Sequence, residues 1–113
     1  MEPQIGFSRA VRSGQYVVVA GTAPIGDDGS TVGPGDVYAQ TVRCLDIAER
    51  ALQEAGASLD DVVKTTVFLV DMSEWGAMNA VYMTYFPNKP ARSAIGTQLL
   101  GNARVEIECI AKR

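Results

Sequence analysis

Histidine is missing from this 113-residue chain. Its absence removes the commonest general base, the usual activator of a serine or cysteine nucleophile, and the commonest metal ligand. Cysteine is scarce as well, because Cys44 and Cys109 are the only two and their spacing is not that of a metal site. We therefore expect no metal and no cofactor, and chemistry that depends on carboxylates, arginine, hydroxyl groups, backbone groups and water.

Long apolar runs are also missing. No stretch approaches the roughly 18 apolar residues of a membrane span, and residues 1–4 lack the basic and apolar stretches of a secretion signal. We therefore expect a cytoplasmic protein that does not contact a membrane. Thiols stay reduced in that compartment, and both cysteines lie in apolar patterns, so we expect two buried free thiols.

Clusters of positive charge are missing too. The net charge is −3, and lysine and arginine are scattered except for Lys112 and Arg113 at the end. Nucleic-acid binding depends on clustered positive charge, so nucleic acid is not an expected partner. The apolar fraction of 47% and the charged fraction of 20% are ordinary for a globular protein, and residues 1–113 are expected to form a single domain.

Hydrophobic periodicity predicts the order β, α, β, α, β, β after an N-terminal hairpin. Asp36 is the expected N-cap of the first helix, Gly56 its C-terminal stop, and Asp71 or Ser73 the cap of the second, which ends before Pro87. Strands are expected at residues 15–21, 64–70, 92–97 and 104–111, and helices at 37–55 and 71–86. A turn-rich connection is expected at 24–36.

The last strand predicts a sheet with two different faces. Val105, Ile107 and Cys109 alternate with Arg104, Glu106 and Glu108, so one face is apolar and lies against helices. Two helices on one face of a mixed sheet make an α+β domain. The strand at 15–21 is apolar on both sides and is expected to be buried on both faces, which predicts a subunit interface over the second face.

Arg92 is the first candidate for chemistry. It enters a strand directly after the turn at residues 88–90. Its planar guanidinium matches a carboxylate with two parallel hydrogen bonds and keeps its charge at any relevant pH. The alternative is an exposed arginine in a surface ion pair, which is the commoner state of this residue type.

Glu106, Glu108 and Asn79 are the other candidates. The two glutamates lie two residues apart on one strand face, about 6.5–7 Å apart, and could share acid and base work or orient a water. The alternative is a solvated strand face. Asn79 lies in the middle of a predicted helix, although asparagine has a low helix propensity. Its amide is expected either to hold a loop or a ligand, or to be exposed without a role.

The hydroxyl groups and glycines form no known catalytic or phosphate-binding motif. Ser8, Ser13 and Ser93 have no histidine to activate them, and no Gly-x-Ser-x-Gly turn is present. The Gly21–Pro24 segment lacks the Gly-Lys-Ser/Thr end of a phosphate loop.

Five segments carry a combined pattern: VAGTAP at 19–24, VKTTVF at 63–68 followed by Asp71, MNAVYMTYF at 78–86, PARS at 90–93 and VEIECIA at 105–111. In this order the five segments resemble the RidA/YjgF family, also called the endoribonuclease L-PSP family. The similarity runs from about Gly6 to Lys112. The resemblance implies a chorismate-mutase-like α+β fold and a homotrimer whose sheets face the trimer core, with active-site clefts between subunits.

The resemblance also implies an activity. Enzymatic members of the family hydrolyse imines and enamines of 2-keto acids, such as 2-aminoacrylate, and release ammonia without a cofactor. This chain would then be a hydrolase of the 2-iminobutanoate/2-iminopropanoate deaminase type, which detoxifies reactive intermediates.

Site residues carry over by position. Arg92 matches the arginine that binds the substrate carboxylate, Glu106 the glutamate that positions the hydrolytic water, and Asn79 the helix asparagine near the cleft. Ser93 and Ala94 follow the arginine, where backbone groups meet the ligand. Ala20, Gly21, Phe7 and Ser8 complete the expected substrate-binding set.

Two positions depart from the deaminase pattern. The deaminases carry a tyrosine near the position of Phe7 and Ser8, and a serine at the position of Ala20. Both changes remove hydroxyl groups from the cleft, which predicts a shifted substrate range or a lower activity.

Two other functions compete. A trimer that binds a small carboxylate as a regulator would need Arg92 but no turnover. A ribonuclease or translation inhibitor is disfavoured by the acidic composition and the missing histidine. Substituting Glu106 by glutamine separates an enzyme from a binder, and salt-sensitive RNA affinity would identify the nuclease.

Overall fold

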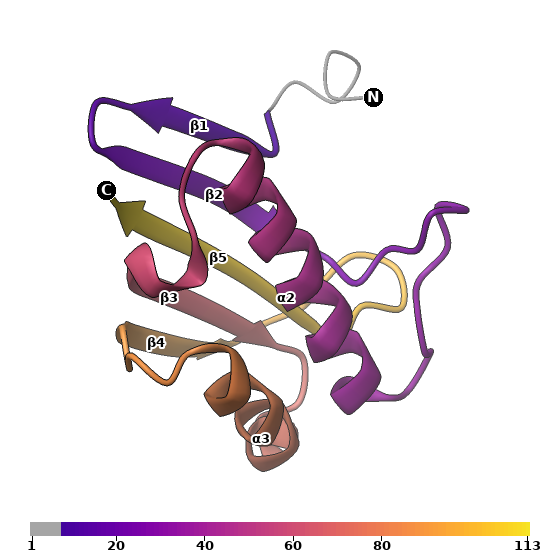
Figure 1. Cartoon of the computed structure of the whole chain (residues 1–113). Coiled ribbons are helices and arrows are strands. Elements are labelled where there is room, and N and C mark those ends of the chain that lie inside the picture. Colours follow the sequence, from indigo (N-terminus) through magenta and orange to yellow (C-terminus); the bar gives the residue numbers. More distant parts are fainter. Residues whose placement is uncertain (1–7) are drawn as a thin grey trace.

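A mixed β-sheet forms one layer of the protein and two helices form the other (Figure 1). The computed structural model describes residues 8–113. The elements are β1 (Ala10–Ser13), β2 (Tyr16–Thr22), α2 (Val37–Glu54), η1 (Leu59–Asp61), β3 (Val62–Leu69), η2 (Met72–Glu74), α3 (Trp75–Tyr85), β4 (Ala91–Gly96) and β5 (Val105–Lys112). The expected α+β arrangement is therefore confirmed, and most boundaries shift by one or two residues. The second helix is the exception: Asp71 caps the 3-10 turn η2 through the Ser73 backbone N–H, and the α-helix itself begins four residues later than expected, at Trp75.

The strand order in the sheet is β1-β2-β5-β3-β4. Only β3 and β4 run parallel, and the other neighbouring strands pair antiparallel. A parallel pair needs a crossover connection, and α3 supplies it between β3 and β4. This crossover places α3 beside β4, the edge strand that carries Arg92.

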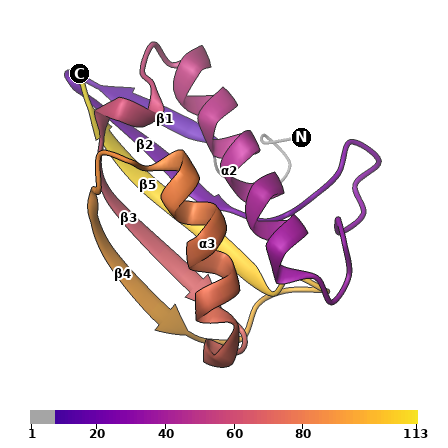
Figure 2. The same ribbon diagram turned by 60° about the horizontal axis from the view of Figure 1, so that its bottom comes forward.

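Both helices cover the same face of the sheet (Figure 2). α2 begins at Asp36, whose side chain accepts a hydrogen bond from the Ala39 backbone N–H at 3.1 Å, and Gly56 follows its end with a φ of +87°. Both terminal signals predicted from the sequence are confirmed. The core between the layers is built from alternate strand residues and the inner sides of the helices, including Val67, Ile107 and Leu45.

We call the other side of the sheet the open face. Tyr16 and Val18 are each 47% exposed there, and Val11 and Ile95 are 54% and 44% exposed. Within the single chain β2 is therefore buried on its helix-covered face only, and the subunit interface expected over its second face stays a prediction.

Cys44 and Cys109 are free and buried, as expected. Burial raises the pKa of both thiols, that of Cys109 to about 12, so neither is a ready nucleophile. Within residues 8–113, neither helix combines the length and the hydropathy that a membrane crossing requires.

Candidate active site

Arg92 lies on the helix-covered face of the sheet, against α3. Its register partner on β3 is Thr65, which is buried beneath the helices. The Nη1 group donates a hydrogen bond to Asn79 Oδ1 at 2.6 Å. The guanidinium carbon lies 4.5 Å from the centre of the Tyr82 ring and 5.2 Å from that of Trp75. An amide and two aromatic rings therefore fix the orientation of this cation.

The Tyr82 ring is a rigid support for Arg92. It is 4% exposed, and its hydroxyl group shares a 2.7 Å hydrogen bond with Thr65 Oγ1. Burial raises the pKa of the Tyr82 hydroxyl, so the ring stays neutral at ordinary pH. The mid-helix Asn79 is explained by the same arrangement, because its amide oxygen orients Arg92 while its Nδ2 donates to Met83 Sδ at 3.3 Å.

No carboxylate of residues 8–113 forms an ion pair with Arg92. Arg43, Arg50, Arg104 and Arg113 all have acidic partners in that part of the chain. A guanidinium offers five N–H donors, and the single bond to Asn79 leaves most of that fork for another acceptor. Its planar shape suits a carboxylate ligand.

Glu106 lies on the open face, beside the irregular part of β2. Its neighbours Val105 and Ile107 are buried on the helix side, and its register partner is Phe68. A Cβ atom on Gly21 would collide with the Glu106 carboxylate, so a larger residue at this position would push the carboxylate away from its place against β2. Glu106 and Gly21, both expected at the site, are thus in contact.

The pKa of Glu106 is raised above its ordinary value. Partial burial is the main cause, and repulsion by the Glu108 carboxylate adds to it, while the positive charge of Arg9 acts in the opposite direction. A carboxylate with a raised pKa is a stronger base when ionised, as general-base catalysis requires.

The other expected residues are distributed over both faces. Ser93 is exposed on the open face, where its Oγ accepts a hydrogen bond from Lys64 Nζ at 2.8 Å. Ala94 is half-buried on β4, and Ala20 is half-buried next to Gly21. Ser8 is exposed ahead of β1, and Phe7 lies outside the described residues.

Arg92 and Glu106 do not come together within one chain. Cross-strand partners share a sheet face, so Arg92 lies with buried Thr65 on the helix side and Glu106 lies with Phe68 on the other. Two strand spacings, about 10 Å, and three residues, about 10 Å more, also separate their backbone positions. The predicted residues therefore form two groups: Arg92 with Asn79, and Glu106 with Gly21.

Sequence reasoning missed Trp75, Tyr82 and Arg9. Trp75 is 36% exposed and Tyr82 is buried, and both rings contact Arg92. Trp75 lies four residues before Asn79 and Tyr82 three residues after it, so helical spacing puts all three on the same side of the helix. This spacing could have identified both rings from the sequence. Arg9 gave no local signal.

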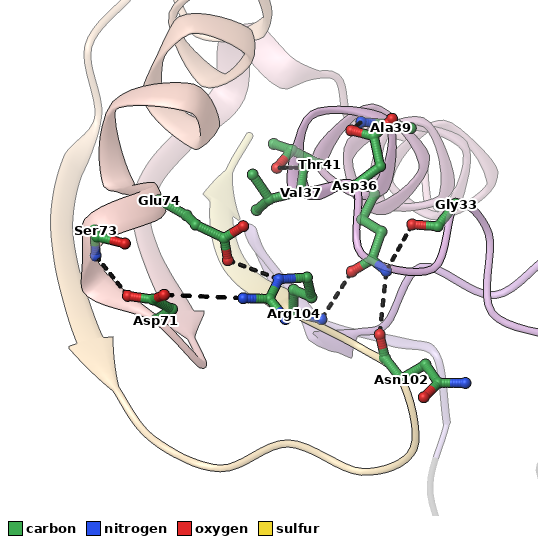
Figure 3. A network of polar contacts seen from close by, with 11 residues as sticks. Gly33, Asp36, Val37, Ala39, Thr41, Asp71, Ser73, Glu74, Asn102 and Arg104 are labelled. Atoms are coloured by element: carbon green, nitrogen blue, oxygen red, sulfur yellow. Dashed lines mark hydrogen bonds and ion pairs between the residues drawn. The ribbon is translucent and has the colours of Figure 1, made fainter.

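A polar network fixes the end of the sheet near α3. Arg104, just before β5, donates to Glu74 at 2.7 Å and lies 4.0 Å from Asp71 (Figure 3). Gln40 is fully buried and accepts from the Arg104 backbone N–H at 2.7 Å. Its amide nitrogen donates to the Gly33 and Asn102 carbonyl oxygens at 3.2 and 3.1 Å. The network joins α2, two loops and the start of α3.

The fold and site define a small α+β protein with an oriented arginine suited to a carboxylate. Comparison with known proteins makes the class specific, because the family model described as Endoribonuclease L-PSP matches residues 1–113. The chain belongs to this family, which confirms the resemblance to RidA/YjgF.

Individual relatives agree with this placement. The chain is 41% identical to a RutC family protein of Pyrococcus abyssi, over 93% of this chain and 84% of the relative. It is 36% identical to a mouse protein named 2-iminobutanoate/2-iminopropanoate deaminase, over 93% and 79% of the two chains.

Solved structures agree as well. Rv2704 of Mycobacterium tuberculosis, a member of the YjgF/YER057c/UK114 family, superimposes with a TM-score of 0.86 at 40% identity, over 99% and 91% of the two chains. Escherichia coli TdcF with bound serine superimposes with a TM-score of 0.87 at 30% identity, over 95% and 87%.

Proposed function

We propose that this protein is a cofactor-free hydrolytic deaminase of small imines and enamines derived from 2-keto acids, such as 2-aminoacrylate. The observation that carries the proposal is the state of Arg92, which is stacked on Tyr82, held by Asn79 and without an acidic partner in residues 8–113. The deaminase name of the mouse relative and the serine bound by TdcF support the same ligand class, a small carboxylate with a nitrogen beside it.

The proposed reaction needs only water and two side chains. Arg92 binds the substrate carboxylate and thereby fixes the neighbouring imine carbon. An enamine such as 2-aminoacrylate enters as its imine tautomer, formed when its C3 gains a proton and its nitrogen loses one. Glu106 accepts a proton from water, the water oxygen bonds to the imine carbon as the C=N π bond opens, and the proton is passed to the nitrogen to give a carbinolamine. Glu106 then carries the hydroxyl proton of this intermediate to the nitrogen, the carbon–nitrogen bond breaks, and ammonia and the 2-keto acid are released. Glu106, with its raised pKa, is suited to carry that proton.

The same proposal requires more than one copy of the chain. The imine carbon is bonded directly to the carboxylate carbon, so a single substrate cannot reach Arg92 and Glu106 on opposite faces of one sheet. We propose a homotrimer whose open faces point toward the trimer axis and in which Arg92 of one copy meets Glu106 of the next. Such an assembly would also cover Tyr16, Val18 and Val11, which are about half exposed in the single chain.

The decisive experiment follows the decay of 2-aminoacrylate generated in situ. Wild-type protein is expected to accelerate it, and Glu106→Gln to lower turnover by on the order of 10²–10⁴-fold while ligand binding remains. Glu49→Gln, on the partly exposed surface of α2, is the control and should behave as wild type. Carboxylate binding without acceleration would indicate a regulatory binder. Salt-sensitive RNA affinity would favour the ribonuclease of the family description instead.

The pH dependence of the reaction should respond to the neighbours of Glu106. Glu106 works as a base in its ionised form, so activity falls as pH drops through its pKa. Because Glu108 raises that pKa, Glu108→Gln should move the acidic limb of the kcat/KM profile to lower pH. Because Arg9 lowers it, Arg9→Gln should move the limb to higher pH. Shifts in the same direction for both variants would contradict the role of Glu106.

A further inference from the structure

Exposed apolar side chains of η2 and α3 lie along one side of the Arg92 site. Trp75 and Met83 lie one turn before and one turn after Asn79, on the same side of the helix. They are 36% and 60% exposed, and Met83 Sδ is 3.3 Å from the Asn79 amide that holds Arg92. Met72 extends the strip along β4, because a Cβ atom on Gly96 would lie 3.1 Å from its Cγ. We call Met72, Trp75 and Met83 the apolar collar.

The collar contributes little to the core of the single chain. Tyr82 and Met78 on the same helix are buried in the core cluster, whereas the three collar residues are not part of it. Trp75 contacts Arg92, Met83 contacts the Asn79 that holds it, and Met72 lies against Gly96 on the same strand. Because Arg92 has no acidic partner in residues 8–113, the exposed surfaces of these side chains are available to the rest of a carboxylate ligand. Methionine adapts to irregular shapes and tryptophan offers a large rigid surface, which suits varied apolar groups.

We propose that the apolar collar binds the side chain of the substrate whose carboxylate pairs with Arg92, and that the site prefers 2-imino acids with large apolar side chains over the alanine-derived one. The proposal rests on the function proposed above, because it takes Arg92 as the carboxylate anchor. The collar itself carries no charge, so a substrate with a charged side chain would lose water there without gaining a partner.

Stable 2-oxo acids, the products of the reaction, test the collar without turnover. Calorimetric affinities are compared for pyruvate, 2-oxobutanoate and 4-methyl-2-oxopentanoate. Each methylene group buried on the collar contributes about a fourfold gain, so 4-methyl-2-oxopentanoate should bind at least about tenfold more tightly than pyruvate. The readout is this affinity ratio, which cancels effects of a variant on the carboxylate anchor.

Collar variants should reduce the ratio. Met83→Gln and Trp75→Ala are each expected to bring it to about threefold or less, if each removes roughly half of the buried apolar area. Leu100→Ala is the matched control, since Leu100 is 94% exposed in the loop that follows β4. It should leave the ratio unchanged.

The two proposals fail in different ways. Equal affinity for pyruvate and 4-methyl-2-oxopentanoate, or a ratio unchanged in both collar variants, overturns the collar proposal even if 2-aminoacrylate is turned over. A size-dependent ratio without turnover of any imine overturns the deaminase and leaves the collar standing. No binding of any 2-oxo acid overturns both.

Discussion

Replacing Arg92 by lysine is expected to lower kcat/KM for 2-aminoacrylate by on the order of 10²-fold, and replacing it by alanine by on the order of 10³-fold. Lysine keeps the charge but loses the planar fork, the stacking on Tyr82 and the directed bond to Asn79. A point charge on a flexible stem still attracts a carboxylate, but it does not fix the imine carbon in front of a water molecule.

The measurement compares initial rates of 2-aminoacrylate decay with thermal unfolding of the same samples. Arg50→Lys is the matched control, because Arg50 is exposed on α2 and pairs with Glu54 at 3.6 Å. It should retain wild-type kinetics. Activity of Arg92→Ala within about threefold of wild type, in a folded sample, would remove Arg92 from the mechanism.

Replacing Gln40 by leucine is expected to cause the largest loss of stability. Three backbone groups depend on this fully buried amide: the Arg104 N–H and the carbonyl groups of Gly33 and Asn102. Leucine fills similar space but leaves all three without their partner, at about 1–3 kcal/mol for each group that stays buried. We expect a loss of about 3 kcal/mol or more, and a fall in Tm of about 10 °C or more.

The test is thermal or denaturant unfolding of the purified variant. Gln53→Leu is the matched control, since Gln53 is exposed on the same helix, and its effect should stay within about 0.5 kcal/mol. A Gln40→Leu protein as stable as wild type would show that water satisfies these backbone groups, and that the amide is not needed to join α2 to the loops.

The ends of α2 and the core face of β5 were predictable because each depends on residues that are close together in the sequence. Asp36 and Gly56 mark the ends of α2 in the sequence, and the alternation in 105–111 identifies the core face of β5. The burial of β2 was not predictable in the same way. Its run of valines is the same whether the second face of the strand contacts solvent or another subunit, so the sequence does not distinguish the two. In the single chain Tyr16 and Val18 on that face are half exposed.

The site was predictable only in part, for a related reason. Arg92 and Asn79 are 13 residues apart, and the resemblance joined them before the structure placed them 2.6 Å apart. The resemblance also joined Arg92 to Glu106, and register alone shows that the two lie on opposite faces. Trp75 contacts Arg92, and Arg9 acts on Glu106 through its charge. In both cases the two residues are far apart in the sequence, so a local sequence pattern does not reveal the pairing.

The separation of Arg92 from Glu106 has a consequence for inheritance. In the proposed assembly each chain lends its arginine to one site and its glutamate to another. A cell that makes both an Arg92 variant and a Glu106 variant would therefore assemble some sites with both intact residues, although neither variant is active alone. Two defective alleles of this gene would then partly complement each other, because the subunits share their active sites.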